Sequence, residues 1–354
     1  MKVLIVKLSS IGDVIHTLPA LTALRRGLGP RSRIDWLVEE GAADVLKRNP
    51  FINSLIVVQP RGWTANAKAN LKTIKWLRAQ KYDAVIDFQG LLKSAVWVRL
   101  SGAARRIGFS NGREMSHVFL NEKLPAYDPD LHAVDRYLLL AGHVAGKGHA
   151  AAPEFLPYVD ERGAAEARRR LVEAGMPEGA GFFVIAPRAR WATKLWDDAK
   201  FAVLAKRLVS STGLYAVLAG SADDRAALDA MRAAIGEKAV NAAGVVGLAE
   251  LSEVFRAASF AVTVDSGPMH AAAAAGTRVI ALFGPTAPWR TGPYGKGHAV
   301  IRKELPCSPC FKKTCNDPRC MTGITVEEVE EAVDKVRRKD EGGINHSAHA
   351  AVEK

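Results

Sequence analysis

The segment Phe260-Ala261-Val262-Thr263-Val264-Asp265-Ser266-Gly267-Pro268-Met269-His270 predicts a strand that leads directly into a helix. The apolar run that ends at Val264 is typical of a buried strand, and the alanine-rich pattern after Pro268 is typical of a helix. Such a turn points free backbone N–H groups and the positive end of the helix into a crevice, where a phosphate can bind. Asp265, Ser266 and His270 would lie at this turn. An ordinary strand-to-helix cap is the alternative.

A second strand–loop–helix unit opens the chain. The β-branched run Val3-Leu4-Ile5-Val6 is followed by Lys7-Leu8-Ser9-Ser10-Ile11-Gly12-Asp13 and then by a helical pattern. The loop has a single glycine, so it lacks the G-x-G-x-x-G dinucleotide fingerprint. It carries one carboxylate, Asp13, at the predicted helix start. Asp is a favoured N-cap, and a carboxylate facing a cleft can also accept a proton, so the two roles are compatible.

The bulk properties fit a soluble, globular protein with room for two domains. The chain has 354 residues, of which 48% are hydrophobic and 24% charged. No apolar run approaches the roughly 20 residues that span a bilayer. Lys2, Lys7, Asp13 and His16 interrupt any signal-peptide core. We therefore expect a cytoplasmic protein.

The net charge of +12, from 49 Lys and Arg against 37 Asp and Glu, suggests an anionic partner. No helix-turn-helix, RNA-binding signature or zinc-finger spacing favours nucleic acid. A phosphorylated substrate or an acidic membrane face fits the charge, and solubility alone explains part of it.

Four cysteines cluster in a C-x2-C-x4-C-x4-C pattern, at Cys307, Cys310, Cys315 and Cys320. Disulfides are not expected in a reducing compartment. Thiolates this close in sequence can converge on a structural zinc ion or an iron–sulfur cluster, but the spacing matches no standard ribbon or ferredoxin. Free thiols in a proline-rich loop are the favoured interpretation, and a structural metal is the alternative.

Strand and helix patterns alternate in both halves of the chain, which predicts two doubly wound α/β domains with parallel sheets. We place the domains at 1–150 and 151–341, joined across the Gly-, Ala- and Pro-rich stretch Gly146–Pro157, with a disordered tail at 342–354. Ligands of such folds bind beyond the carboxyl ends of the strands. Asp13 and Asp265 occupy that position, one in each half.

Several segments of the sequence resemble a known family, in the family's order from residue 1 to about 295. They are Val3–Leu21, Asp35–Gly41, Tyr82–Ser94, Lys194–Trp196, Asp265–His270 and Phe283–Thr286. By these motifs the chain resembles the ADP-heptose:lipopolysaccharide heptosyltransferases of glycosyltransferase family 9, and within them the heptosyltransferase I branch. The resemblance implies two Rossmann-like domains that face a central cleft, the GT-B type of glycosyltransferase fold.

The resemblance also implies an activity. Heptosyltransferases of this branch transfer L-glycero-D-manno-heptose from ADP-heptose to a Kdo residue of Kdo-lipid A, with inversion at the anomeric carbon. By similarity, Asp13 is the general base and Lys194 stabilises the departing diphosphate, so no cofactor is expected. An enzyme with this lipid acceptor would work at the inner face of the anionic inner membrane. We expect no nucleic acid partner and no obligate protein partner.

The expected donor-binding residues belong to the second half. The loop Ala186–Lys194 departs from the family's small-residue loop, and its two arginines could add phosphate contacts. Asp223 and Asp224 either touch a donor hydroxyl or are helix-start acids, and the second interpretation is favoured. The full donor set is Arg188, Ala189, Arg190, Lys194, Asp223, Asp224, Asp265, Ser266, Gly267, Met269 and His270.

The expected acceptor-binding residues belong to the first half, because a carboxylate- and phosphate-bearing acceptor needs Arg and Lys. Each of these side chains also has a simpler interpretation as a solvated surface charge. The set is Lys7, Ser10, Gly12, Arg61, Lys93, Arg113 and Arg136.

Three alternatives remain open from the sequence. One is another member of the same family, such as a heptosyltransferase II or an enzyme that uses another nucleotide sugar. A second is a nucleotide-sugar 2-epimerase, which can share the two-domain fold. The third is a non-enzymatic nucleotide- or lipid-binding protein, in which Asp13 only caps a helix.

Overall fold

The computed structural model describes residues 1–60, 65–146, 153–155 and 160–348. The chain divides into two compact units, Met1–Val159 and Asp160–Lys354. Most of the Gly146–Pro157 stretch that was predicted to join them lies outside the described residues.

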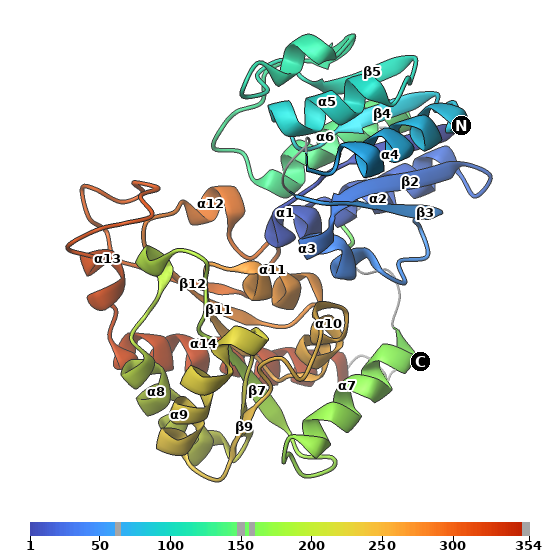
Figure 1. Ribbon diagram of the computed structural model, residues 1–354. Coiled ribbons are helices and arrows are strands. Elements are labelled where there is room, and N and C mark those ends of the chain that lie inside the picture. Colours follow the sequence, from blue (N-terminus) through green and yellow to red (C-terminus); the bar gives the residue numbers. More distant parts are fainter. Residues whose placement is uncertain (61–64, 147–152, 156–159, 349–354) are drawn as a thin grey trace. The chain divides into compact units, whose positions relative to one another are not determined.

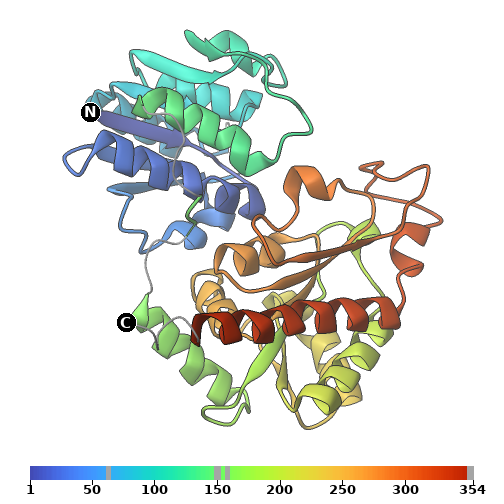
Figure 2. The same cartoon turned by 180° about the vertical axis from the view of Figure 1, so that it is seen from behind.

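Unit 1 contains a parallel six-stranded sheet in the order β3-β2-β1-β4-β5-β6. The strands are β1 (Lys2–Val6), β2 (Arg33–Glu39), β3 (Ser54–Val58), β4 (Ala84–Asp87), β5 (Arg105–Phe109) and β6 (Glu122–Leu124). The helices are α1 (Ile11–His16), α2 (Leu18–Leu28), α3 (Glu40–Ala43), α4 (Ala67–Gln80), α5 (Leu92–Leu100) and α6 (Ala133–Ala145), with 3₁₀ turns η1 (Asp44–Leu46) and η2 (Ser116–Phe119). Helices α4 and α5 lie over one face of the sheet in Figure 1, and α2 and α6 lie over the other in Figure 2.

Strand β1 is the centre of this sheet. Val3, Leu4, Ile5 and Val6 are fully buried, as expected for a parallel strand covered by helices on both faces. In register, Val6 lies between Leu37 of β2 and Asp87 of β4. The strand order reverses between β1 and β4, which is where doubly wound folds bind ligands. The loop after β1 therefore lies at the expected ligand edge of unit 1.

Unit 2 repeats this topology, with a parallel sheet in the order β12-β11-β10-β7-β8-β9. The strands are β7 (Phe182–Ala186), β8 (Tyr215–Leu218), β9 (Ala239–Asn241), β10 (Ala261–Val264), β11 (Val279–Phe283) and β12 (Ala299–Arg302). The helices are α7 (Glu161–Glu173), α8 (Asp198–Thr212), α9 (Arg225–Ile235), α10 (Leu248–Ala257), α11 (Gly267–Ala274), α12 (Pro288–Thr291), α13 (Arg319–Thr322) and α14 (Val326–Ala348), with 3₁₀ turns η3 (Ala192–Lys194) and η4 (Ala222–Asp224). Figure 2 shows α14, in red, running across this unit.

The core of unit 2 packs on the sheet from strands far apart in sequence. Phe183 of β7 and Phe260, just before β10, stack with their ring centroids 5.0 Å apart. Trp196 packs edge-on against Phe201 of α8, and its indole N–H donates to the Ile324 carbonyl oxygen at 3.1 Å. The strand pairing and the Phe183–Phe260 stack hold β7 and β10 side by side, so the turns that follow both strands are fixed relative to each other.

The predicted fold class, two doubly wound α/β domains, is confirmed in each unit. The sequence did not predict β6, β9 and β12, which are edge strands of only three or four residues. Helix α14 reaches Ala348, although the sequence predicted a disordered tail from residue 342. The helix continues through Gly342 and Gly343, which cost about 1 kcal/mol each in a helix but do not forbid it. Within the described residues, no helix is long and apolar enough to cross a membrane.

Candidate active site

Asp13 lies in the first turn of α1, which follows the carboxyl end of β1, and its two carboxylate oxygens have different surroundings. Asp13 Oδ2 accepts hydrogen bonds from the Ser10 backbone N–H (3.1 Å) and the Ser10 hydroxyl (2.8 Å), which form a capping box. Asp13 Oδ1 lies 3.8 Å from the Lys7 ammonium. The Asp13 side chain is 38% exposed. Ser10 is therefore the N-cap of α1, and Asp13, three residues later, completes the capping box through Oδ2.

Lys7 lies beneath this loop and is almost fully buried. Its ammonium donates to the Tyr137 hydroxyl (2.7 Å) and the Phe88 carbonyl oxygen (3.1 Å), and it lies over the Tyr137 ring. Burial lowers the pKa of Lys7, but Tyr137 and the Asp13 carboxylate raise it by more, so the net pKa is raised. Burial also raises the pKa of Tyr137, which keeps the phenol neutral. Lys7 is thus a permanent buried cation that faces Asp13.

Lys7 was predicted to touch the acceptor, and the structure places its side chain in the interior of unit 1. Only 2% of its side chain is exposed, because the strand end turns it inward under α6. Its charge therefore acts on Asp13 rather than on a ligand in solvent.

Residues after β2 and β4 hold the Asp13 loop in place. Gln89 Oε1 accepts the backbone N–H groups of Leu8 (3.1 Å) and Ser9 (3.2 Å). The Lys93 ammonium donates to Ser9 Oγ (2.7 Å) and Glu39 Oε1 (2.8 Å). Lys93 is still 37% exposed, so it can fix the loop and also face a ligand.

The turn after β4 is built on Asp87, which is buried. Asp87 Oδ1 accepts the backbone N–H groups of Gln89 (2.9 Å) and Gly90 (3.0 Å), and Oδ2 accepts the Ser94 hydroxyl (3.1 Å). Burial raises the pKa of Asp87, and these hydrogen bonds lower it in part. The Arg113 backbone N–H donates to the Gly90 carbonyl oxygen at 2.9 Å, which brings that exposed arginine to the same edge.

The other predicted acceptor residues are placed as follows. The Arg136 guanidinium, on the first turn of α6, stacks over the Tyr127 ring at 4.7 Å. Gly12 is buried in α1, and Ser10 is exposed at its N-cap. Arg61 lies outside the described residues.

In unit 2, three neighbouring strand ends bring Lys194, Asp265 and Thr286 together. These residues follow β7, β10 and β11, which are adjacent in the sheet. The Lys194 ammonium lies 2.6 Å from Asp265 Oδ2 and 4.7 Å from the centre of the Trp191 ring. The Thr286 hydroxyl donates to the same Asp265 oxygen at 2.6 Å. Lys194 is 17% exposed and Asp265 is 5% exposed, so a buried carboxylate positions a partly accessible ammonium.

The turn into α11 has the predicted strand-to-helix form. Ser266 is the N-cap and Pro268 lies in the first helical turn. The Ser266 hydroxyl oxygen is buried and has no hydrogen-bond partner among the described residues. Met269, which was predicted to bind the donor, is fully buried, because its position on α11 points its side chain into the core. His270 is buried on the same helix.

Arg188 was predicted to contact the donor, but it is held within the fold. Its guanidinium makes two hydrogen bonds to the Asp198 carboxylate, at 2.6 and 2.7 Å, and its Nε lies 3.9 Å from Asp224. The Asp198 and Asp224 carboxylates thus neutralise the positive charge of Arg188, which a phosphate could otherwise bind. Asp224 caps η4 through the Ser221 N–H (2.8 Å), so it is a helix-start acid. Asp223 and Arg190 are exposed, whereas Ala189 packs on the core.

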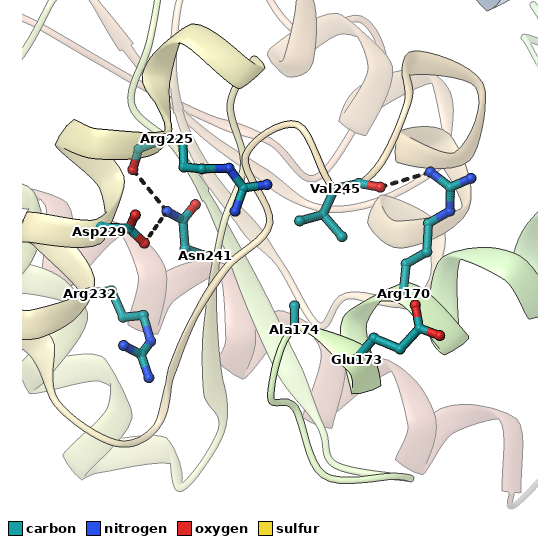
Figure 3. Close-up of a pocket in the computed structure, with 8 residues that line it drawn as sticks. All are labelled: Arg170, Glu173, Ala174, Arg225, Asp229, Arg232, Asn241 and Val245. Atoms are coloured by element: carbon teal, nitrogen blue, oxygen red, sulfur yellow. Dashed lines mark hydrogen bonds between the residues drawn. The ribbon is translucent and has the colours of Figure 1, made fainter.

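The loop after β9 is anchored at a separate cavity of about 370 Å³ between α7 and α9. The Arg170 guanidinium donates to the Val245 carbonyl oxygen at 2.8 Å, and the Asn241 amide donates to Asp229 (2.7 Å) and to the Arg225 carbonyl oxygen (3.0 Å) (Figure 3). None of the predicted donor residues lines this cavity. Its hydrogen bonds fix the approach to α10.

The four cysteines line one cavity of about 550 Å³. Burial and the neighbouring thiols raise the pKa of Cys320. Although distant in sequence from the catalytic motifs, the cysteine loop contacts the donor turns. The N–H groups of Cys310 and Phe311 donate to the Pro285 carbonyl oxygen, and the Thr193 hydroxyl donates to the Lys312 carbonyl oxygen at 2.8 Å. Across the described part of the chain, no group of three or more His, Cys, Asp or Glu side chains is arranged to hold a metal ion.

Comparisons with known proteins agree with this geometry. The pattern described as glycosyltransferase family 9 (heptosyltransferase) matches residues 70–320. The chain belongs to glycosyltransferase family 9. It is a glycosyltransferase, as the sequence motifs predicted.

Named relatives of this family 9 enzyme support the heptosyltransferase I branch. Lipopolysaccharide heptosyltransferase 1 of Pseudomonas aeruginosa is 35% identical over 324 residues, covering 89% of this chain and 87% of the relative. Two solved E. coli structures share the fold. Heptosyltransferase II has a TM-score of 0.79 at 26% identity, covering 96% and 100% of the two chains. A heptosyltransferase solved with ADP has a TM-score of 0.78 at 29% identity, covering 95% and 100%. The predicted GT-B fold class is thereby confirmed for this family 9 enzyme.

Sequence reasoning assigned no role to Gln89, Glu39, Tyr137 or Thr286. The first two lie in motifs that the sequence did single out, Tyr82–Ser94 and Asp35–Gly41, and Thr286 lies in Phe283–Thr286. Their positions after strands were the available signal. Tyr137 lies on a helix 130 residues from Lys7, and no local pattern links the two.

The Lys7–Tyr137 contact gives a stability prediction. Replacing Tyr137 by Phe removes a hydrogen bond to a buried ammonium and should cost about 1.5–3 kcal/mol of unfolding free energy at neutral pH. In the Lys7→Met background the same change should cost far less, because no ammonium is left unsatisfied. Denaturant unfolding of the four proteins measures this cycle.

The pH dependence follows from the sign of the shift. Because the pKa of Lys7 is raised in the folded protein, the ammonium contributes stability below its usual pKa of 10.5, and this stability is lost as the pH rises through the raised value.

In the mutant cycle, an equal cost of Tyr137→Phe in the wild-type and Lys7→Met backgrounds would show that the two side chains are not coupled.

Proposed function

We propose that this family 9 enzyme transfers L-glycero-D-manno-heptose from ADP-heptose to a Kdo residue of Kdo-lipid A, with inversion at the anomeric carbon. The observation that carries the proposal is Asp13, whose Oδ2 belongs to the capping box of α1 and whose Oδ1 lies 3.8 Å from the Lys7 ammonium. The names of the relatives, lipopolysaccharide heptosyltransferase 1, support the sugar and the pathway.

Asp13 acts as the general base in this proposal. Asp13 Oδ1 takes the proton from the acceptor hydroxyl while the hydroxyl oxygen attacks the anomeric carbon of the donor. The new C–O bond forms opposite the diphosphate, the old bond between the anomeric carbon and the phosphate oxygen breaks, and ADP leaves with the electron pair. The buried Lys7 ammonium keeps the carboxylate ionised before the proton arrives. Removal of a proton by a positioned base is worth about 10²–10⁴-fold in rate.

Lys194 and the start of α11 hold the donor diphosphate. The ammonium is partly exposed and positioned by buried Asp265, and the free N–H groups around Ser266 and Gly267 lie at a positive helix end. Together they stabilise the charge that develops on departing ADP, and we propose that transfer needs no cofactor. His270 and Met269 lie on the same helix and, with Arg188, stay in the proposed donor set on sequence grounds.

Lys93, Arg113 and Arg136 are the proposed acceptor contacts, with Ser10 and Gly12 shaping the loop beside them. Arginine and lysine suit the carboxylate and phosphates of Kdo-lipid A. Arg61 stays in this set on sequence grounds. Because the acceptor is a lipid, we propose that the enzyme works at the cytoplasmic face of the inner membrane as a peripheral protein, without an obligate protein partner.

A heptosyltransferase II acceptor is the second candidate, favoured by the similarity to E. coli heptosyltransferase II. It would use the same donor and base. Acceptors with and without a first heptose distinguish the two candidates.

Replacing Asp13 by Asn tests the base directly. The amide oxygen can still accept the Ser10 hydrogen bonds, so folding should be preserved, but an amide cannot take the proton. We expect kcat for acceptor-dependent ADP release to fall by at least about 10²-fold, with the KM for ADP-heptose little changed.

Asp197→Asn is the matched control. Asp197 caps α8 by accepting the Ala199 N–H at 2.8 Å and has no proposed role in transfer, so its variant should keep normal activity. Near-normal transfer by Asp13→Asn, or ADP release that needs no acceptor, would reject the mechanism.

Replacing Lys194 by Met tests the donor site. Loss of the only ammonium proposed to meet the diphosphate should weaken ADP binding by about tenfold or more, measured by calorimetry. Lys206→Met, at an exposed position on α8, is the control and should bind ADP normally. Unchanged ADP binding by Lys194→Met would place the diphosphate elsewhere.

A further inference from the structure

Helix α4 of unit 1 carries an exposed basic face with no acidic counterpart. Residues 45–82 contain eight Lys and Arg and no Asp or Glu. Lys68, Lys72 and Lys75 are exposed on this helix, and within the described part of the chain no ion pair joins them to a carboxylate.

These lysines lie on one stripe of the helix. Successive residues are about 100° apart around a helix, so Lys68, Lys72 and Lys75 share the side opposite Leu77, which is fully buried against the sheet. Lys72 is four residues after Lys68 and three before Lys75, spacings at which like charges destabilise a helix. Elsewhere the fold offsets such charges: Arg169 on α7 pairs with Glu166 at 2.8 Å. On α4 the repulsion has no compensation within the described residues.

Two large apolar side chains flank the stripe. Leu71 is 53% exposed on one side and Trp76 is 39% exposed on the other. Exposed Leu and Trp beside lysines are the composition of helices that lie in a membrane interface, where the rings and aliphatic groups enter the headgroup region and the ammoniums meet anionic lipid.

The direction of α4 places this face next to the candidate base. The helix connects β3 to β4, two parallel strands, so it runs back along the sheet from its carboxyl edge (Figure 1). Its first turn, with Lys68 and Leu71, therefore lies toward the edge that carries Asp13.

We propose that α4 is the surface by which the enzyme docks on an anionic lipid bilayer, with Lys68, Lys72 and Lys75 as the electrostatic contact and Leu71 and Trp76 as shallow apolar anchors. This proposal rests on the proposed function in one respect: a lipid acceptor is the reason for the enzyme to bind a membrane. A bilayer fits better than a soluble partner, because one face combines uncompensated positive charge with exposed apolar groups.

Vesicle partition of the full-length protein tests the surface without donor or acceptor. The wild type should bind phosphatidylcholine vesicles that contain phosphatidylglycerol much more tightly than phosphatidylcholine alone, and salt should release it. The variant Lys68→Gln/Lys72→Gln/Lys75→Gln should partition about 10–100-fold more weakly into the anionic vesicles.

A variant with the same loss of charge controls for net charge. Arg162→Gln/Arg168→Gln/Lys206→Gln removes three exposed cations from α7 and α8 and should bind like the wild type to within about threefold. Leu71→Ala/Trp76→Ala should lower the binding that survives at high salt. Unfolding curves should show that every variant is folded, with the lysine variant at least as stable as the wild type because it loses the like-charge repulsion on α4.

Two results would overturn the proposal. One is that the wild type binds anionic and neutral vesicles equally well. Binding to short duplex DNA together with this result would show that the basic face serves a nucleic acid instead. The other is equal binding by the lysine and control variants. Heptose transfer to an acceptor dispersed in detergent is measured separately. The lysine variant should keep the wild-type kcat in this assay. A lower kcat would instead make these lysines acceptor ligands. A wild type that binds vesicles but transfers no heptose would leave the docking surface standing and reject the proposed function.

Discussion

The Lys7 ammonium, buried under the loop that carries Asp13, is the contact on which the site of unit 1 depends. A buried cation must be satisfied, and Tyr137, Phe88 and Asp13 share this task. The tyrosine fixes the distance between α6 and the end of β1, and Asp13 supplies the negative charge. The capping box then engages the other carboxylate oxygen, so the fold orients this carboxylate from two sides. One arrangement thereby serves both stability and the proposed proton transfer.

Unit 2 uses the opposite arrangement. There the carboxylate, Asp265, is the buried partner, and the ammonium, Lys194, is the partly exposed one. Thr286 and Trp191 complete the set from neighbouring turns. A buried cation beneath an accessible carboxylate suits removal of a proton, whereas a buried carboxylate beneath an accessible cation suits binding of a diphosphate. The repeated strand order provides both from the same strand-end positions.

Local sequence patterns predicted the parts of this fold that residues close together in the sequence determine. Apolar runs predict inner strands at 84–87 and 182–186, and these are the bounds of β4 and β7, because such runs mark burial on both faces of a sheet. The edge strand β9 has only three residues and was missed. Asp13 was predicted as an N-cap, whereas the structure has Ser10 at the N-cap and Asp13 at the third helical position of a capping box. The partners of Lys7 and Arg188 could not be predicted for the opposite reason: Tyr137 and Asp198 are brought to them by tertiary packing, and the charge of a residue does not reveal which groups the fold places beside it.

The central claim is that Asp13 removes the acceptor proton while Lys7 keeps it ionised. The pH dependence of kcat/KM, compared between wild type and Lys7→Met, tests this most directly. Loss of an ammonium 3.8 Å from the carboxylate should move the acid side of the profile to higher pH, since the ionised form loses its stabilising charge. An acid side that stays at the same pH in a folded Lys7→Met protein would contradict the account.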